Sequence, residues 1–575
     1  METAYKQVPY GVADFEVVRK QNLYYVDKTM YVPQLEDEAR FLFFTRPRRF
    51  GKSIFINMLK AYYDCRKKED FDVLFGDLWI GRHPTPLQGK YQVLYFDFSQ
   101  VGGCVDQIEE KLNSYCCICL NSFIEYYREY YTADFVTTML GYSDAAEKLN
   151  HLGVEAKKLG IPLYLIIDEY DNFTNTILNE HGESVYHAIT HADGFYRDIF
   201  KKFKGNFERI FMTGVSPVTL DDVTSGFNIG WNISVKANFN EMLGFATEDV
   251  RTMFQYYQRV GQLSPDCDIE AMIAEMKPWY DNYCFAEEAL KGKNRVFNCD
   301  MVLYYLRNYM STGHAPKNMI DPNTRTDYGK MKRLLRFGQL DGVRRGMIRE
   351  IAETGQIVAQ LYESFSAFQI ADPNIFPSLL FYYGMLTLKG TRGNRVILGI
   401  PNNNVRKQYY GYLLEEFQQQ RYVDTNELDE GFYQMAYEGN WEHVLRFMAE
   451  AYAQVSSVRD GVEAERNLQG FFMAYFNLNT YYCTAPELEL NHGFCDFFLL
   501  PDLTNYATQH SYILELKMLH KGSSEEAARK QWDEAKEQIN GYAQAPRVEV
   551  LRQGTQLHKI IMQFEGYKLK RMEEV

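Results

Sequence analysis

The chain has 575 residues, and 46% hydrophobic and 24% charged content is typical of globular protein and excludes a disordered one. That length exceeds what one hydrophobic core serves, so three or four domains are expected. The formal net charge of −14 excludes a protein coated with basic surface, and any contact with nucleic acid must therefore be local.

The cysteine count and the lengths of the apolar runs indicate where in the cell the protein is expected. Ten cysteines in a chain of this length do not form a disulfide framework. Residues 1–11 hold no apolar signal region, and no apolar run approaches the roughly 18–20 residues that cross a bilayer. The sequence therefore predicts a cytoplasmic protein with no membrane partner.

Residues 1–245 alternate short apolar segments with helical patterns. Strands are expected at 41–45, 93–99, 163–168 and 209–215. Such alternation is typical of a parallel sheet with crossover helices, which gathers ligands at the carboxyl ends of its strands. The sequence thus predicts an α/β multidomain protein that begins with a parallel-sheet domain.

The middle of the chain changes pattern twice. Residues 246–355 are helical in character and are expected to form a lid region. Within 356–455, a helix at 377–386 leads into a hairpin at 387–400 and then into another helix, followed by connecting helices. This order predicts a winged-helix-like module.

The last predicted domain spans 456–575. It reads as a helix at 465–477, strands at 494–500 and 511–517, and a helix at 523–543. This order predicts a C-terminal α/β domain, and the family resemblance given below implies that its fold is restriction-endonuclease-like.

A basic stretch runs from 325 to 349 and contains only two acidic residues, Asp327 and Asp341. Its basic residues are Arg325, Lys330, Lys332, Arg333, Arg336, Arg344, Arg345 and Arg349. The stretch is either a solvated helical face or a patch that follows a nucleic-acid backbone, and the sequence leaves both open.

The first expected strand runs into a turn that ends Gly51-Lys52-Ser53. In a phosphate-binding P-loop, backbone N–H groups wrap the phosphates, a lysine neutralises charge and a hydroxyl holds Mg²⁺. The first glycine of the general pattern falls at Arg46, so the motif is incomplete by itself. The residues assigned to nucleotide binding are Arg48, Arg49, Phe50, Gly51, Lys52, Ser53, Asp168 and Thr213.

The strand at 163–168 ends in Asp168-Glu169, the usual second element of such a site. Asp168 would hold Mg²⁺ together with Ser53, and Glu169 would activate the attacking water. Thr213, at the end of the next strand, would sense the γ-phosphate. Arg48 and Arg49 would contact phosphate or a neighbouring subunit, or be solvated. The alternative is an ordinary strand followed by an acidic turn.

A second constellation lies near the C-terminus, where Asp496, Glu515 and Lys517 interrupt apolar strands. Two carboxylates on neighbouring strands can hold Mg²⁺, or Mn²⁺ in its place, and Lys517 shares a strand face with Glu515. Gln538 and Tyr542, four residues apart, share a helix face and resemble the helix motif of RecB-like nucleases. The alternative is a salt-bridge cluster in an inactive domain.

Four segments together resemble the bacterial AAA-ATPase-like family: PYGVADFEVVRKQNLYYVDKT, RPRRFGKS, LIIDEYDNF and TGVSPVTL. Its members are commonly joined to a C-terminal nuclease domain of the PD-(D/E)xK superfamily. The resemblance implies that RPRRFGKS replaces the glycine-rich loop, and it implies a role for Asp27-Lys28. It also implies nuclease-motif roles for Glu465 and Glu489, with Glu487 as an extra acid nearby, whereas Pro486 and Gln469 depart from the family pattern.

These features predict an ATP-binding, ATP-hydrolysing protein whose Mg²⁺-dependent DNA nuclease domain is gated by the ATPase. Defence, repair or mobile-element maintenance would suit a guarded nuclease, and homo-oligomers are among the expected assemblies. The alternative function is a nucleotide-switched DNA-binding or signalling protein with an inactive nuclease fold. RNA as the substrate also stays open.

Overall fold

The structure is a computed structural model. It describes residues 5–101, 107–171, 195–219, 230–292, 294–316, 318–321, 323, 342–366, 369, 372–418, 425–456, 465–476, 478–490, 493–503 and 506–575. The chain forms two compact units, one of Met1–Arg345 with Gln356–Val405 and one of Gly346–Gly355 with Arg406–Val575. The finer division into four domains stays a prediction.

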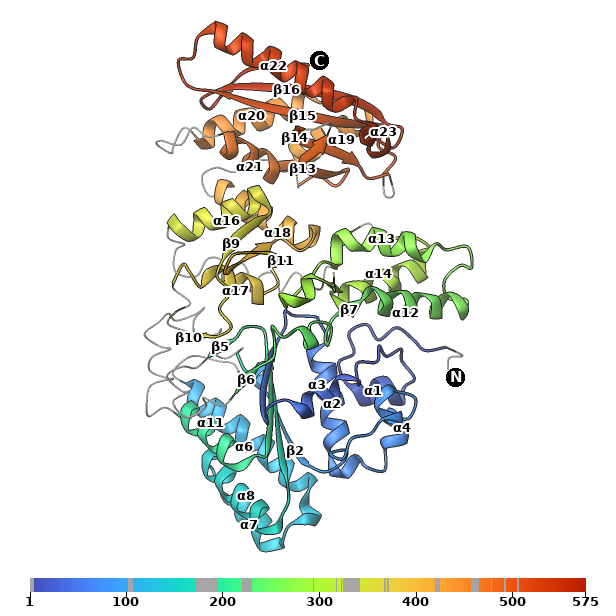
Figure 1. Ribbon diagram of the computed structural model, residues 1–575, viewed down its shortest axis with the longest axis vertical. Coiled ribbons are helices and arrows are strands. Elements are labelled where there is room, and N and C mark those ends of the chain that lie inside the picture. Colours follow the sequence, from blue (N-terminus) through green and yellow to red (C-terminus); the bar gives the residue numbers. More distant parts are fainter. Residues whose placement is uncertain are drawn as a thin grey trace. The chain divides into compact units, whose positions relative to one another are not determined.

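The first unit contains a five-stranded parallel sheet with the order β2-β3-β4-β1-β6 (Figure 1). Its strands are β1 (Phe41–Thr45), β2 (Gln92–Asp97), β3 (Leu163–Asp168), β4 (Arg209–Gly214) and β6 (Trp231–Asn232). Every residue of β3 is buried, because a parallel sheet is covered on both faces and selects continuous apolar runs. The expected α/β fold is confirmed, and the expected second strand ends earlier, because Phe98–Gln100 forms a 3-10 turn.

Helices cover the sheet on both sides in Figure 1, where α1 and α3 lie opposite α8 and α11. The helices of this part are α1 (Phe15–Lys20), α2 (Tyr31–Asp37), α3 (Lys52–Tyr63), α4 (Phe71–Phe75), α5 (Trp79–Arg82), α6 (Ile108–Tyr126), α7 (Ala133–Gly141), α8 (Ala145–Leu159) and α11 (Phe195–Asn206). Helix α3 begins directly after the Gly51 turn and contacts β2 and β3. The turn is therefore held between a buried strand and a buried helix.

The expected helical region is confirmed as α12 (Thr247–Arg259), α13 (Ile269–Tyr280) and α14 (Cys299–Thr312). They share a core that includes Met253, Phe254 and Tyr305. Asn298 caps α14 by accepting a hydrogen bond from the Met301 N–H at 3.3 Å. Met253 of α12 and Asp300 and Leu303 of α14 line a cavity described below, and these three helices are called the lid helices from here on.

The expected helix, hairpin and helix are α17 (Phe376–Tyr382), the antiparallel pair β11 (Thr387–Arg392) and β12 (Arg395–Gly399), and α18 (Asn403–Gln418). An unexpected strand, β9 (Gln356–Ala359), pairs with β12 to complete a three-stranded sheet. The remaining elements of this middle part are β5 (Val218–Thr219), β7 (Phe245–Ala246), β8 (Val296–Phe297), β10 (Phe365–Ser366) and α16 (Gly342–Thr354).

Most of the basic stretch at 325–349 lies outside the described residues. Arg344 is described and is 7% exposed, with its guanidinium 5.9 Å from the centre of the Phe376 ring. The solvated-face alternative is therefore wrong for Arg344, because this side chain is used in packing.

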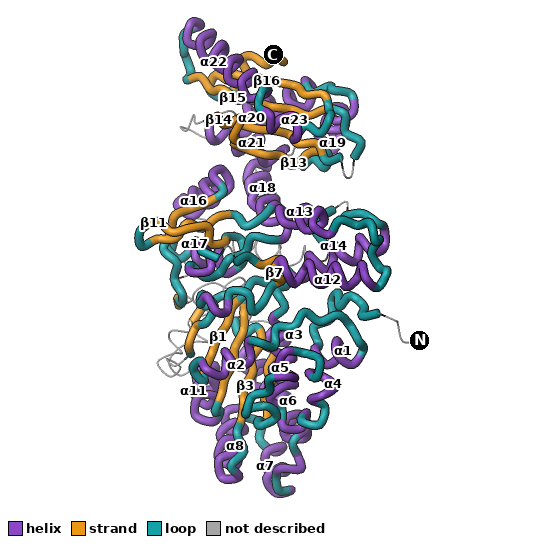
Figure 2. The backbone as a smooth tube through the Cα atoms, turned by 45° about the vertical axis from the view of Figure 1, so that its right-hand side comes forward, coloured by secondary structure: helices purple, strands orange, loops and turns teal. Residues whose placement is uncertain are grey.

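The second unit contains a mixed sheet with the order β13-β14-β15-β16-β17 (Figure 2). Its strands are β13 (Tyr482–Leu490), β14 (Gly493–Pro501), β15 (His510–Leu519), β16 (Gln556–Glu565) and β17 (Lys568–Glu574). Only β15 and β16 run parallel to each other. The helices are α19 (Thr425–Tyr437), α20 (Glu442–Ser456), α21 (Glu465–Phe476), α22 (Glu525–Ala543) and α23 (Pro546–Leu551).

The core of this unit lies between the sheet and α22, where Trp532 and Ile539 pack with Phe498 and Ile513. Across the described residues, no helix combines the length and the apolar character needed to cross a membrane. The eight cysteines whose side chains are described carry free thiols.

Candidate nucleotide and nuclease sites

The turn between β1 and α3 is tight and contains two residues with a left-handed backbone. Gly51 has a φ of +89° and Arg49 a φ of +67°, in the left-handed region that favours glycine. The buried Lys52 side chain donates to the carbonyl oxygens of Arg46 and Pro47, both at 3.0 Å. Burial lowers the pKa of Lys52, while the nearby acids Glu169 and Asp168 oppose that shift. Its ammonium can exchange these neutral carbonyls for phosphate oxygens.

Arg46 takes the place of the first P-loop glycine, yet its side chain lies in the core. It is 1% exposed, between the rings of Phe44 and Phe285 at 4.2 and 4.1 Å. Its guanidinium donates to the carbonyl oxygens of Thr45, Ser234 and Phe239. Arg46 therefore fixes the base of the loop rather than contacting a ligand. Burial lowers its pKa to about 9, which still leaves it charged at neutral pH.

Ser53 and Asp168 meet at the carboxyl edge of the sheet. The Ser53 hydroxyl donates to Asp168 Oδ2 at 2.9 Å. Burial raises the pKa of Asp168 to about 6, partly offset by the Lys52 charge and the Ser53 hydrogen bond. A hydroxyl and a carboxylate at hydrogen-bond distance are the oxygen donors that Mg²⁺ prefers, so these residues fit the ion.

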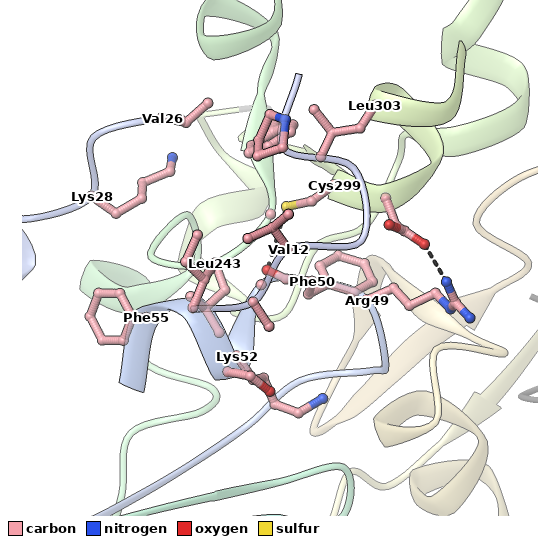
Figure 3. Close-up of a pocket in the computed structure, with 18 of the residues that line it drawn as sticks. Val12, Val26, Lys28, Arg49, Phe50, Lys52, Phe55, Leu243, Cys299 and Leu303 are labelled. Atoms are coloured by element: carbon pink, nitrogen blue, oxygen red, sulfur yellow. Dashed lines mark hydrogen bonds and ion pairs between the residues drawn. The ribbon is translucent and has the colours of Figure 1, made fainter. Parts of the chain in front are cut away.

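Glu169 has a φ of +51°, a left-handed backbone that is uncommon for a residue with a side chain. Its carboxylate lies 3.6 Å from the Arg48 guanidinium in an ion pair. Arg49 instead forms an ion pair, dashed in Figure 3, with Asp300 at the start of α14. It also donates to the Asn323 carbonyl at 2.9 Å. In this structure, the two arginines therefore contact the candidate base and the lid.

Thr213 lies on β4, which separates the P-loop strand β1 from the acidic strand β3. Its hydroxyl is buried and has no hydrogen-bond partner among the described residues. Sequence reasoning overlooked its neighbour Asp171, whose carboxylate accepts from the N–H groups of Val215 and Ser216 at 3.1 and 2.8 Å. Asp171 thus shapes the loop after β4, and its place in LIIDEYDNF was the available signal.

A cavity of about 430 Å³ lies above the P-loop (Figure 3). Arg48, Arg49, Phe50, Gly51, Lys52, Ser53 and Glu169 line it, whereas Asp168 and Thr213 do not. The opposite walls come from residues 9–28, from residues 242–245 and from the lid helices, and they are mostly apolar, as at Val12, Leu243 and Leu303. The cavity thus joins a charged floor to an apolar wall, as a nucleotide requires.

The Asp27-Lys28 element also acts at this cavity. Asp27 fixes its own turn by accepting from the Thr29 hydroxyl at 2.6 Å and from the Trp79 N–H at 2.6 Å. Lys28 lines the cavity and forms an ion pair with Asp249 of α12 at 2.6 Å. A second cation, besides Arg49, therefore connects the site to a lid helix.

The C-terminal constellation converges on one part of the sheet. Lys517 Nζ donates to Glu515 Oε1 at 2.8 Å, as expected for residues two apart on a strand. Asp496 on β14 accepts from the Leu516 N–H at 2.6 Å, which fixes it beside that pair. The Glu515 side chain is 3% exposed and that of Lys517 is 18% exposed. Two carboxylates and an ammonium are thus held together in a largely buried position.

The structure describes the other predicted nuclease-motif residues only in part. Tyr542 is buried on α22, and desolvation followed by the charge of Glu515 raises its pKa. Gln538 is exposed. Glu465 begins α21 and Glu487 and Glu489 lie on β13, but their side chains are outside the description. Among described residues, no group of three or more His, Cys, Asp or Glu side chains could hold a metal ion.

Gln469 was noted in the sequence only as a departure from the family pattern. Its amide donates to Asp496 Oδ1 at 2.6 Å, so it contacts the candidate metal ligand directly. Asp496 therefore accepts from Gln469 through one oxygen and from the Leu516 N–H through the other.

Comparison with known families finds a match for two parts of the chain. Residues 9–224 match the AAA-ATPase-like family, described as predicted AAA-ATPase, and residues 463–574 match the PD-(D/E)XK nuclease superfamily. The chain joins an AAA-ATPase-like domain to a PD-(D/E)XK nuclease-superfamily domain. The P-loop cavity lies within the first domain, and Asp496, Glu515 and Lys517 lie within the second.

Two individual proteins are also similar. An uncharacterised protein from the vnfD 5′ region of Azotobacter chroococcum mcd 1 is 24% identical over 299 residues. The match spans about half the length of this curated relative and half of this chain. The ORC2 protein of Aeropyrum pernix, solved in ADPNP-ADP complexes, aligns over 68% of this chain and 92% of its own, at 11% identity and a TM-score of 0.30. That likeness is too low to support an argument.

Proposed function

We propose that the protein binds and hydrolyses ATP and cleaves DNA in a Mg²⁺-dependent reaction that the ATPase-like domain controls. The observation that carries the proposal is the grouping of Asp496, Glu515 and Lys517 within a nuclease-superfamily domain. Burying an acid and a base together costs desolvation free energy that their ion pair offsets only in part, and buried clusters of this kind are common at functional sites.

In the nucleotide site, the triphosphate would lie on the Gly51 turn with its phosphates against the α3 N-terminus and Lys52. Ser53 and Asp168 would hold Mg²⁺, which neutralises charge on the phosphates. Glu169 would accept a proton from the attacking water. For that role its carboxylate must leave Arg48, which is then available to a phosphate.

In the nuclease site, Asp496 and Glu515 would hold the divalent ion, with Mg²⁺ preferred and Mn²⁺ as a substitute. When bound, such an ion would supply a positive charge for the scissile phosphate and would lower the pKa of a water molecule bound to it. Lys517, beside Glu515, would orient the attacking water and stabilise the negative charge that develops on the phosphate.

The pairing of a nucleotide site with a nuclease on one chain supports control of cleavage by nucleotide state. A cutting domain that stays inactive until triggered suits defence, repair or mobile-element maintenance, and defence is the role that we favour. Cytoplasmic location and assembly into homo-oligomers belong to the same proposal.

The test is to incubate the purified full chain with supercoiled and linear DNA, with and without Mg²⁺ and ATP. Gel analysis should show cleavage that requires Mg²⁺ and whose rate changes when ATP is added. Absence of cleavage under every condition would refute the nuclease, and cleavage indifferent to ATP would refute the control.

The second candidate is a nucleotide-switched DNA-binding protein without cleavage. The hydrogen bonds from Gln469 and Leu516 to Asp496 favour it, because both carboxylate oxygens already accept protein donors. Titration calorimetry of the full chain with Mn²⁺ separates the two functions. Heat that disappears in an Asp496→Asn variant supports the nuclease, and identical titrations support the switch.

A further inference from the structure

The outer part of the hairpin β11–β12 in the first unit is exposed, and all its charged residues are basic. Lys389, Arg392 and Arg395 are exposed, and the sequence from Thr387 to Gly399 contains no Asp or Glu. This local charge contrasts with the formal net charge of −14 of the whole chain. A hairpin of this kind offers cations to an anionic partner.

The register of the hairpin strengthens that argument. Arg392 lies directly opposite Arg395, and Gly393, with a φ of +63°, makes the tight turn between the two strands. Like charges directly opposite each other on a sheet repel, so the pair is unfavourable in isolation. A bound phosphate would relieve this repulsion.

The hairpin is joined to the P-loop by residues 281–285. The Cys284 N–H donates to the Thr387 hydroxyl at 2.7 Å, and the Leu388 N–H donates to the Cys284 carbonyl at 3.2 Å. These bonds add the segment to the start of β11. The hairpin base is therefore hydrogen-bonded directly to residues 281–285.

Two aromatic rings of the same segment pack against the P-loop. Tyr283 and Phe285 make edge contacts with Phe50, with ring centres 4.9 and 5.7 Å apart. Phe50 directly precedes Gly51 and lines the cavity. A change in the loop on nucleotide binding would therefore reach the aromatic pair that holds the hairpin base.

A second contact reaches the P-loop from the turn before β11. Gly384, with a φ of +76°, lies so close to Pro47 that a side chain at this position would meet the proline ring at 2.9 Å. Both routes connect the loop that would surround the phosphates with the hairpin.

We propose that the β11–β12 hairpin binds the phosphate backbone of DNA. In the same proposal, nucleotide binding at the P-loop changes the affinity of the hairpin for DNA through residues 281–285. The inference rests on the proposed function for its nucleotide and for its DNA partner. It adds the contacting surface and the path that connects it to ATP.

The surface is tested by fluorescence anisotropy with a labelled duplex. All proteins carry Asp496→Asn, so that binding is read without cleavage. Arg392→Gln with Arg395→Gln should weaken binding by about tenfold or more and reduce the salt slope by about 2, since each lost phosphate contact lowers it by roughly 0.9. The matched control, Arg40→Gln with Arg82→Gln, makes the same charge change at exposed positions elsewhere.

Binding of the control at the parent's affinity, together with the loss in the hairpin variant, supports the surface. Equal affinities for parent and hairpin variant would overturn it, as would an equal loss in the control. Failure of the nuclease leaves these readings unchanged, because no cleavage is measured.

The path is tested by repeating the titration with a non-hydrolysable ATP analogue. The parent's DNA affinity should change with the analogue, and Tyr283→Leu should remove the change while still binding the analogue. Melting curves of the variant verify that it is folded. The path would be overturned if the DNA affinity of the parent were the same with and without the analogue. It would also be overturned if the affinity of a folded Tyr283→Leu variant still changed with the analogue.

Discussion

Ser53 and Asp168 lie 115 positions apart in the sequence, and the serine hydroxyl donates to the aspartate carboxylate at 2.9 Å. The contact depends on the sheet order, in which β4 separates β1 from β3 and sets the spacing between the P-loop and the acidic strand end. It places the two predicted Mg²⁺ ligands together, and several predictions depend on this geometry.

Asp168 should make the stability of the nucleotide-free protein depend on pH. Its folded pKa is about 6, above its ordinary value of 3.8, so the folded state binds more protons between these values. Stability is therefore lost as pH rises through that window, by up to about 3 kcal/mol. Asp168→Asn should raise the Tm at pH 7 and much less at pH 4.5.

The control for this experiment is Asp72→Asn at an exposed position, which should leave the Tm difference between the two pH values as in the parent. An Asp168→Asn effect of the same size at both pH values would contradict burial as the origin of the shift.

Glu169→Gln should separate ATP binding from hydrolysis. The amide keeps the shape of the side chain but cannot accept the proton, which should lower the hydrolysis rate by about 10²–10⁴-fold. Phosphate release gives the rate, and calorimetry with ATP gives the affinity, expected to stay near the parent's. Glu147→Gln, at an exposed position, is the control, and normal turnover by Glu169→Gln would remove Glu169 from the mechanism.

Arg46→Ala should destabilise the first unit, although the residue occupies a P-loop position. The change empties the space between Phe44 and Phe285 and leaves the Ser234 carbonyl without its donor, with an expected cost of about 3–5 kcal/mol. Thermal melting should show a clear fall in Tm, whereas exposed Arg40→Ala should not. A Tm within about 1 °C of the parent's would show that the buried stack is dispensable.

The sequence predicted the first sheet well because its strands are continuous apolar runs that are buried on both faces, as in β3. The last domain was harder. β17 (KLKRMEE) is a charged edge strand without an apolar face, and β13 carries Pro486, which an edge strand tolerates. The sequence of β16 contains polar residues such as His558 and Gln563, which are buried in the structure. Its pattern is therefore not that of an apolar strand.

The residues of the two candidate sites also divide into those that the sequence predicted and those that it did not. Lys52, Ser53 and Asp168 were predictable because the motif places them at strand ends that a parallel sheet brings together. The core position of Arg46 depends on Phe285, more than 200 positions away, and the contact of Gln469 with Asp496 depends on how α21 meets β14. Spacing along the chain does not report such partners.

The central claim is that Asp496, Glu515 and Lys517 form a metal-dependent phosphodiesterase centre. Its most direct measurement is the initial rate at which supercoiled plasmid is nicked in Mg²⁺ by the parent and by Asp496→Asn. The account predicts nicking by the parent and a loss of about 100-fold or more in the variant. Equal rates for the two proteins would contradict it.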